Sequence, residues 1–394
     1  SATVTAGKSG FALTSADKKY SLKLRGYAQA DGRFYLDDKE DKSVDSFLIR
    51  RARVIFDGDL GERVSFRIAP DFGNGKSELQ DAYVDFKPAT AFNIRAGRTK
   101  VPFGLERLQS STDTLFNETA LSTALTPNYD EGVQLFGKLF TNTVEYAVGV
   151  FNGGPDGASV DSDSNDDKDL AGRLWFSPFR NSDVDAISGL SFGIAGTFGK
   201  QEGSDASTQL PSYKTSGQQT FFSYKTSTNK GESVVADGDH TRVSPQLYYQ
   251  LGSLGLLAEY VTSEQDVSNS KGSDSLSHDA WQVAASYVLT GEKASLRGVE
   301  PASEFSLANG TWGAIELVAR YSELSIDDKT FSGGYADAKK SASGAENTGV
   351  GINWYATRNT KISVDYETTA FDGGAAEGDR DDEQIIIARA QVKF

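Results

Sequence analysis

The chain has 394 residues, and its 40 Lys and Arg stand against 55 Asp and Glu, which gives a formal net charge of −15. This charge excludes an ordinary nucleic-acid-binding protein, which would be basic. The absence of Cys excludes disulfides and thiolate metal sites. Because the chain begins at Ser1 and has no Met, we expect either that an export signal has been removed or that the sequence has been engineered. An exported chain without disulfides is typical of the bacterial envelope.

No run of apolar residues approaches the ~20 that a membrane-spanning helix needs. The other structure that can cross a membrane is a closed barrel, in which each strand turns an apolar face to lipid and a polar face to water. Such strands have a period of two, and only every second residue needs to be apolar.

The first predicted strand covers residues 19–35. Tyr20, Leu22 and Leu24 fall on one parity, and Lys23 and Arg25 fall on the other. The same alternation recurs along the chain, at residues 52–56, 82–86, 144–150, 281–289, 315–321 and 362–366. Alternation of this kind predicts β-strands with one apolar face and one polar face.

The connections between these runs alternate between long polar segments and tight turns. Residues 36–45, 100–129 and 152–168 are long links, whereas residues 58–62 and 141–142 are short. This asymmetry is typical of an outer-membrane barrel with long outer loops and short periplasmic turns. A large soluble β-sandwich or solenoid is the alternative, because its strands also alternate.

Seventeen runs look like strands, but a bacterial single-chain barrel has an even number. Residues 218–225 alternate least cleanly, so we assign them to an outer loop, which leaves 16 strands. The prediction is an all-β, transmembrane antiparallel barrel over residues 19–394 in the bacterial outer membrane. Residues 1–18 are predicted to form a periplasmic N-terminal segment. The last strand has apolar residues on its even positions and ends on Phe394, as outer-membrane barrels usually do.

Positive charge is concentrated in the first strands. Residues 1–110 carry 19 Lys and Arg against 15 Asp and Glu, whereas the remainder carries 21 against 40. The basic residues on or beside the polar parity include Lys23, Arg25, Arg33, Arg50, Arg51 and Arg53. In a narrow lumen such guanidinium groups would concentrate anions and suit phosphate oxygens. The alternative is that they are simply solvated lumen residues.

Several motifs resemble the phosphate- and pyrophosphate-selective outer-membrane porins, the porin O and P family. They are Gly97-Arg98 with Phe103-Gly104-Leu105-Glu106-Arg107 and Ser110-Ser111, the Arg50-Arg51 pair, and Gln80-Asp81-Ala82. The resemblance implies a 16-stranded homotrimer whose third loop folds into the lumen as a constriction. It also implies that this constriction is lined by basic residues, two serines and an aspartate. The matching positions are Arg107, Ser110, Ser111 and Asp81, with Arg50 and Arg51 nearby.

This sequence departs from the family at several basic positions. Thr112, Ser65 and Tyr27 stand where phosphate-specific members carry a lysine, a lysine and an arginine. In the fifth outer loop, where those members have an arginine ladder, the chain has only lysines, at Lys214, Lys225 and Lys230. Fewer cations imply a weaker anion site.

The predicted function is an outer-membrane porin, not an enzyme, that favours small anions resembling phosphate or polyphosphate. Arg50, Arg51, Arg98 and Arg107 would form the constriction, with the serine hydroxyls donating to the solute and Asp81 holding a basic partner. The alternatives are a general, weakly selective porin and a plugged barrel that binds ligands at the outer surface. The expected partners are small anionic solutes, outer-membrane lipid and lipopolysaccharide, and two further copies of the chain; no nucleic acid is expected.

No cofactor or metal site is predicted. The Asp161-x-Asp163-x-Asn165 segment begins like a calcium loop, but it lacks the glycine at position six and the glutamate at position twelve. His240 and His278 are too far apart in sequence to form a helical metal-binding pair.

Overall fold

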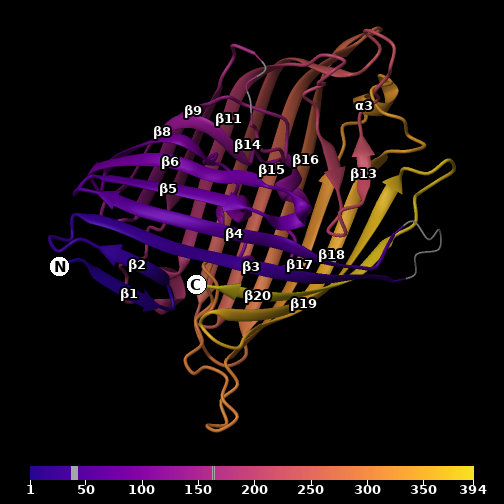
Figure 1. Ribbon diagram of the computed structural model, residues 1–394. Helices are drawn as coiled ribbons and strands as arrows, with labels where there is room; N and C mark the ends of the chain where they lie inside the picture. The colour runs from indigo at the N-terminus through magenta and orange to yellow at the C-terminus, as the bar shows by residue number, and fades with distance from the viewer. Residues whose placement is uncertain (37–42, 162, 164) are drawn as a thin grey trace.

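The computed structural model describes residues 1–36, 43–161, 163 and 165–394. Within these residues, sixteen antiparallel strands form a closed barrel, in which each strand pairs with the next and β20 pairs with β3 (Figure 1). The strands are β3 (Tyr20–Leu36), β4 (Ser46–Leu60), β5 (Val64–Asp71), β6 (Glu78–Ala89), β7 (Phe92–Lys100), β8 (Tyr129–Leu139), β9 (Val144–Phe151), β10 (Asp169–Phe176), β11 (Leu190–Glu202), β14 (Val235–Leu251), β15 (Leu254–Asn269), β16 (Gly272–Val288), β17 (Ala314–Ser325), β18 (Ala342–Tyr355), β19 (Thr360–Gly373) and β20 (Glu383–Lys393). The predicted fold class and strand number are confirmed.

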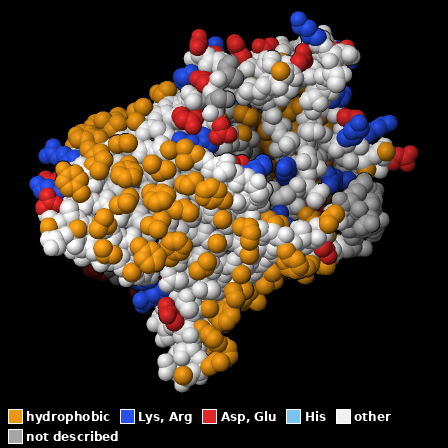
Figure 2. Space-filling view, in the orientation of Figure 1, with side chains coloured by type: hydrophobic (Ala, Val, Ile, Leu, Met, Phe, Trp, Pro, Cys, Tyr) orange, Lys and Arg blue, Asp and Glu red, His pale blue; other side chains and the backbone are white. Residues whose placement is uncertain are grey.

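The two faces of the wall strands differ as the alternation predicts. In β3, Leu22 and Ala28 are exposed on the outside, whereas Tyr27 and Asp31 are buried on the inside. Exposed hydrophobic side chains continue around the later strands, at Val243, Leu247, Val283, Tyr287, Leu317, Ile352 and Val364. Figure 2 shows such side chains spread over the outer wall. This is the face that a barrel presents to lipid.

An N-terminal hairpin of β1 (Thr3–Gly7) and β2 (Gly10–Thr14) extends the wall next to β3. β2 pairs with residues 21–24, near the N-terminal end of β3. β20 pairs with residues 27–36, which form the rest of the same strand edge. The ring of Phe11 packs edge-on against that of Phe394, with centroids 6.1 Å apart. The hairpin therefore joins the start of the wall to the end of the chain.

The long connections gather at one end of the barrel, opposite the end that holds Tyr20 and Phe394. Two connections depart from the predicted rule. Residues 270–271 form a tight turn at the long-loop end, and residues 289–313 form a long projection at the other end. This projection is the lowest part of Figure 1.

Loop 5 (residues 203–234) contains β12 (Ser212–Lys214) and β13 (Thr220–Ser223), which form a separate two-stranded sheet. The prediction that residues 218–225 do not form a wall strand is therefore confirmed. Phe221 and Phe222 are fully buried in a cluster with residues on the inner faces of β15, β16 and β17, namely Val261, Leu276 and Leu324. The hairpin thus lies inside the barrel, and the inner face beside it is apolar.

The helices are short: α1 (Leu105–Leu108), η1 (Gly73–Gly75), η2 (Leu121–Leu125), α2 (Asp185–Ser188) and α3 (Lys329–Ser332). None of the helices in the described part of the chain is long and apolar enough to cross a membrane.

Loop 3 (residues 101–128) follows β7 and carries α1 and η2. The backbone N–H of Leu105 donates to Glu259 on β15, and that of Asn117 donates to Asp365 on β19, both at 2.6 Å. In the strand order, β15 and β19 both lie six strands from β7, one in each direction around the wall. Loop 3 therefore contacts the inner wall across the barrel from the strand that it follows.

Candidate functional site: a cation-lined cavity beside loop 3

The inner face of the first wall strands carries basic side chains, and several of them are paired with carboxylates. Arg25 and Arg67 both lie 2.7 Å from Asp57, and Arg53 lies 3.0 Å from Asp71. Period-two strands place these residues on one face, so opposite charges on neighbouring strands meet. Each pair reduces the net charge that its arginine presents to the lumen.

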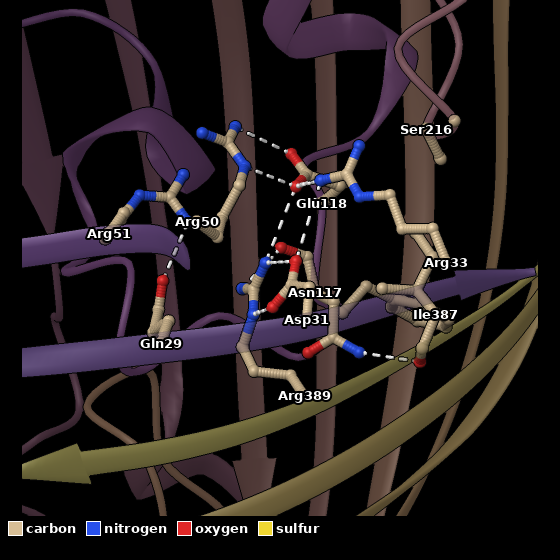
Figure 3. A network of polar contacts seen from close by, with 12 residues as sticks. Gln29, Asp31, Arg33, Arg50, Arg51, Asn117, Glu118, Ser216, Ile387 and Arg389 are labelled. Carbon is tan, nitrogen blue, oxygen red and sulfur yellow. Dashed lines mark hydrogen bonds and ion pairs between the residues drawn. The ribbon is translucent and has the colours of Figure 1, made fainter. Parts of the chain in front are cut away.

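Arg50 and Arg51 are adjacent, yet both side chains point into the lumen (Figure 3). The pairing of β3 with β4 passes from Gln29 opposite Arg51 to Ala30 opposite Ile49, which leaves Arg50 as an extra residue. A β-bulge of this kind turns one more side chain to the same face. Strict alternation would have placed one of the two arginines on the lipid face.

A cavity of about 250 Å³ lies between this bulge and loop 3. The wall contributes Arg50, Arg51, Arg53 and Lys100, the link between β5 and β6 contributes Lys76, and loop 3 contributes Arg107. The carboxylates on its lining are Asp71, Glu78 and Glu106.

Three of the lining cations have only neutral partners. Arg51 donates to the amide oxygen of Gln29 at 2.9 Å, and Lys100 donates to the carbonyl oxygen of Gln109 at 2.7 Å. Arg107 donates to the hydroxyl of Thr126 and to a backbone carbonyl. Across the described residues, none of the three forms an ion pair with a carboxylate. Burial lowers the pKa of Arg107 to about 10, so this side chain keeps its charge at neutral pH.

The two loop serines differ in their positions. Ser111 lines the cavity, and its hydroxyl lies 2.7 Å from that of Tyr27. Ser110 is exposed, and its hydroxyl pairs with that of Thr112 at 2.9 Å. Asp81 lies on the inner face of β6, and no ion pair joins it to a basic side chain in the part of the chain that the structure describes.

Arg98 is not brought together with the other predicted constriction residues. In the ladder it stands opposite Glu131 on β8, on the outward-facing side that also carries Val133. Its guanidinium contacts Glu131 and Asp161, each at 2.8 Å, and the carbonyl oxygen of Val160. Arg95 of the same strand lies on the inward-facing side, and it pairs with Asp85 on β6.

Arg33 and Lys23 lie on the inner-facing parity of β3. Arg33 is buried against Glu118 of loop 3 at 2.7 Å, so it does not line the cavity. Lys23 stands nearer the chain termini, opposite Asp57 of β4.

The sequence interpretation missed two residues that organise this region. Arg389 on β20 shares the odd, inward parity of Ile387 and Gln391, so the alternation of the last strand could have identified it. Glu118 lies in loop 3, which has no period, and no sequence signal marks its contacts with the wall.

The two histidines hold loops against the inner wall. His240 lies 3.2 Å from Asp156, and His278 lies 2.7 Å from the hydroxyl of Tyr224. Residues 162 and 164 of the acidic segment lie outside the described residues. Among those described, no group of three or more His, Cys, Asp or Glu could hold a metal ion.

A closed 16-stranded barrel with a lipid-compatible outer face and a polar cavity inside is the architecture of an outer-membrane channel. Residues 22–394 match the family described as phosphate-selective porin O and P. The chain therefore belongs to this family of bacterial outer-membrane porins.

Individual relatives are distant. Porin O of Pseudomonas aeruginosa is 23% identical over 98% of this chain and 91% of its own length. The outer membrane channel DcaP of Acinetobacter baumannii has a similar fold, with a TM-score of 0.61, 12% identity, and coverage of 98% of this chain and 100% of that one. The trimer form of OmpT of Vibrio cholerae gives a TM-score of 0.59 and 12% identity, covering 95% of this chain and 99% of that one.

Proposed function

We propose that this porin favours small anions of the phosphate class and that they pass through the cavity beside loop 3. The observation that carries the proposal is the placement of Arg51, Lys100 and Arg107 on one cavity with only neutral partners. Such cations attract an anion, and the guanidinium fork suits oxyanions in particular. With an effective dielectric of ~20, one charge at ~4 Å contributes about 4 kcal/mol before desolvation, so each should affect selectivity.

The proposed constriction lies between the β4 bulge and loop 3. Arg50, Arg51, Arg107 and Ser111 remain in it from the sequence prediction, and Lys100 joins them. The side-chain hydroxyl of Ser111 would donate to the solute. The carboxylates of Asp71 and Glu78 on the same lining would keep the anion from binding too tightly to leave, as conduction requires.

A general, weakly selective porin is the second candidate. Its support is the pairing of Arg53 with Asp71 and of Arg95 with Asp85, together with the contacts of Arg25 and Arg67 to Asp57, which lower the net positive charge along the inner face of the first strands.

Phosphate block of chloride current in planar bilayers tests the proposal. Arg107→Gln and Lys100→Gln should each weaken the block several-fold. Arg95→Gln is the matched control, because Arg95 faces the lumen but is paired with Asp85 and does not line the cavity. If phosphate block is unchanged in all three variants, the weakly selective porin is the better description.

We also propose that the protein is a homotrimer that contacts lipid and lipopolysaccharide, with residues 1–18 on the periplasmic side. The trimer form of OmpT, which has a similar fold, supports the assembly. Chemical cross-linking in outer-membrane vesicles should give a trimeric band, and a monomer alone would contradict this part of the proposal.

A further inference from the structure

The carboxylate of Glu118 lies among three arginines that come from three wall strands (Figure 3). It accepts hydrogen bonds from Arg50 on β4 at 2.7 and 3.1 Å, and from Arg33 on β3 at 2.7 Å. Arg389 on β20 donates at the longer distance of 3.5 Å. We call Arg33, Arg50 and Arg389 the three-arginine cluster. A carboxylate that accepts from several guanidinium groups is held as a bound oxyanion would be.

The three arginines depend on Glu118 to different degrees. Arg389 has a carboxylate of its own, because it donates to both oxygens of Asp31 at 2.6 and 2.7 Å. Arg33 lies 3.6 Å from the same carboxylate. For Arg50, Glu118 is the only carboxylate within ion-pair distance in the described residues. Removing the charge of Glu118 would therefore leave Arg50 without an anionic partner.

Glu118 stays ionised in this setting. Burial alone would raise the pKa of its carboxyl, but Arg50 and the other guanidinium groups around it hold that pKa well below its ordinary value. Glu118 and Arg33 are both about 5% exposed. The negative charge is therefore present in the pore at neutral pH.

Arg50 also lines the cavity, next to Arg51. The bulge places these neighbours on one face, but only Arg50 is paired with Glu118. Loop 3 thus supplies an anion to one of the two adjacent arginines and leaves the other to the solute.

We propose that Glu118 is a specificity-determining residue of the pore: its carboxylate occupies an oxyanion site formed by the three-arginine cluster and so excludes an external anion from it. The site would otherwise bind a small oxyanion of the phosphate class. This inference extends the proposed function. On this view, the inner wall carries more arginines than are free to bind an external anion, because Glu118 already pairs with some of them.

Glu118→Gln tests the inference, with inorganic phosphate as the probe of chloride current in planar bilayers. Phosphate block should become about tenfold stronger, since a hydrogen bond to a charged group contributes at least that factor. The matched control is Asp85→Asn, which removes one buried lumen charge that is paired with Arg95 but lies outside the cavity lining. An equal change in both variants would mean that net lumen charge alone matters and would overturn the inference.

A comparison of the adjacent arginines keeps the inference testable if Glu118→Gln fails to assemble. Arg51→Gln should weaken phosphate block more than Arg50→Gln, because Arg50 is already neutralised. In the Glu118→Gln background, Arg50→Gln should remove the gain. Equal losses from the two single variants would contradict the inference. Cation selectivity of the unmodified pore would contradict the proposed function. The inference about Glu118 is tested separately, by the differences in phosphate block between the variants.

Discussion

The hydroxyl groups of Tyr27 and Ser111 lie 2.7 Å apart and connect β3 to loop 3. Tyr27 stands where phosphate-specific relatives are expected to carry an arginine, and its ring also lies 5.4 Å from the guanidinium of Arg53. The tyrosine therefore contacts one guanidinium group of the cavity lining and positions a serine on the same lining.

Tyr27→Phe should lower the free energy of unfolding by about 1 kcal/mol, the net contribution of a typical internal hydrogen bond. Denaturant unfolding of the detergent-solubilised protein measures the change. Tyr366→Phe is the control, because its hydroxyl makes an exposed contact with Gln384 on the lipid-facing side. A larger fall in the free energy of unfolding in Tyr366→Phe than in Tyr27→Phe would contradict a stabilising hydrogen bond between Tyr27 and Ser111.

Gly73→Ala should displace the β4 bulge. A Cβ at Gly73 would lie 2.4 Å from the carbonyl oxygen of Arg50 and 2.7 Å from the Cα of Arg51, and backbone atoms cannot move aside as a flexible side chain can. Overpacking of this kind costs about 1–3 kcal/mol. We expect a lower unfolding midpoint together with weaker phosphate block. Gly172→Ala, where the nearest atom is 3.8 Å away, should change neither.

Phe222→Ala should widen the pathway. Phe222 is fully buried in the cluster that holds loop 5 against the inner wall, and loss of a buried aromatic ring costs about 3–5 kcal/mol. The loosened hairpin should increase single-channel conductance or its fluctuations. Phe140→Ala, in an exposed turn, is the control. Identical conductance in both variants would indicate that loop 5 does not restrict the pore.

Phe394→Ala should impair assembly. The backbone of Phe394 exchanges two hydrogen bonds with Gly26, and its ring packs on Phe11. Without the ring, the contact between the hairpin and the end of β20 is lost. The temperature at which the folded band disappears on a gel should fall, and it should fall further than in Val392→Ala, an exposed outward position.

The wall of this barrel could be predicted from the sequence, because alternation is a local property. The inward and outward sets of β3 and the exclusion of residues 218–225 both followed from period two. Parity also separates Arg98 from Arg95, since the two positions differ by an odd number. What period two cannot reveal is a bulge, so the shared orientation of Arg50 and Arg51 required the strand register.

The contents of the lumen were harder to predict. Phe221 and Phe222 pack against apolar inner-face residues such as Val261 and Leu276, which a strictly polar lumen would not contain. Glu118 meets arginines from both ends of the chain, and such contacts depend on closure of β20 onto β3. Long-range pairing of this kind leaves no mark in a local pattern.

The reversal potential of the purified, unmodified protein in a potassium chloride gradient tests the central claim most directly. If Arg51, Lys100 and Arg107 govern the pathway, the potential should have the sign of chloride preference, and it should move toward zero in the variant with all three changed to Gln. A potential of the sign set by potassium in the unmodified pore would contradict an anion-favouring porin.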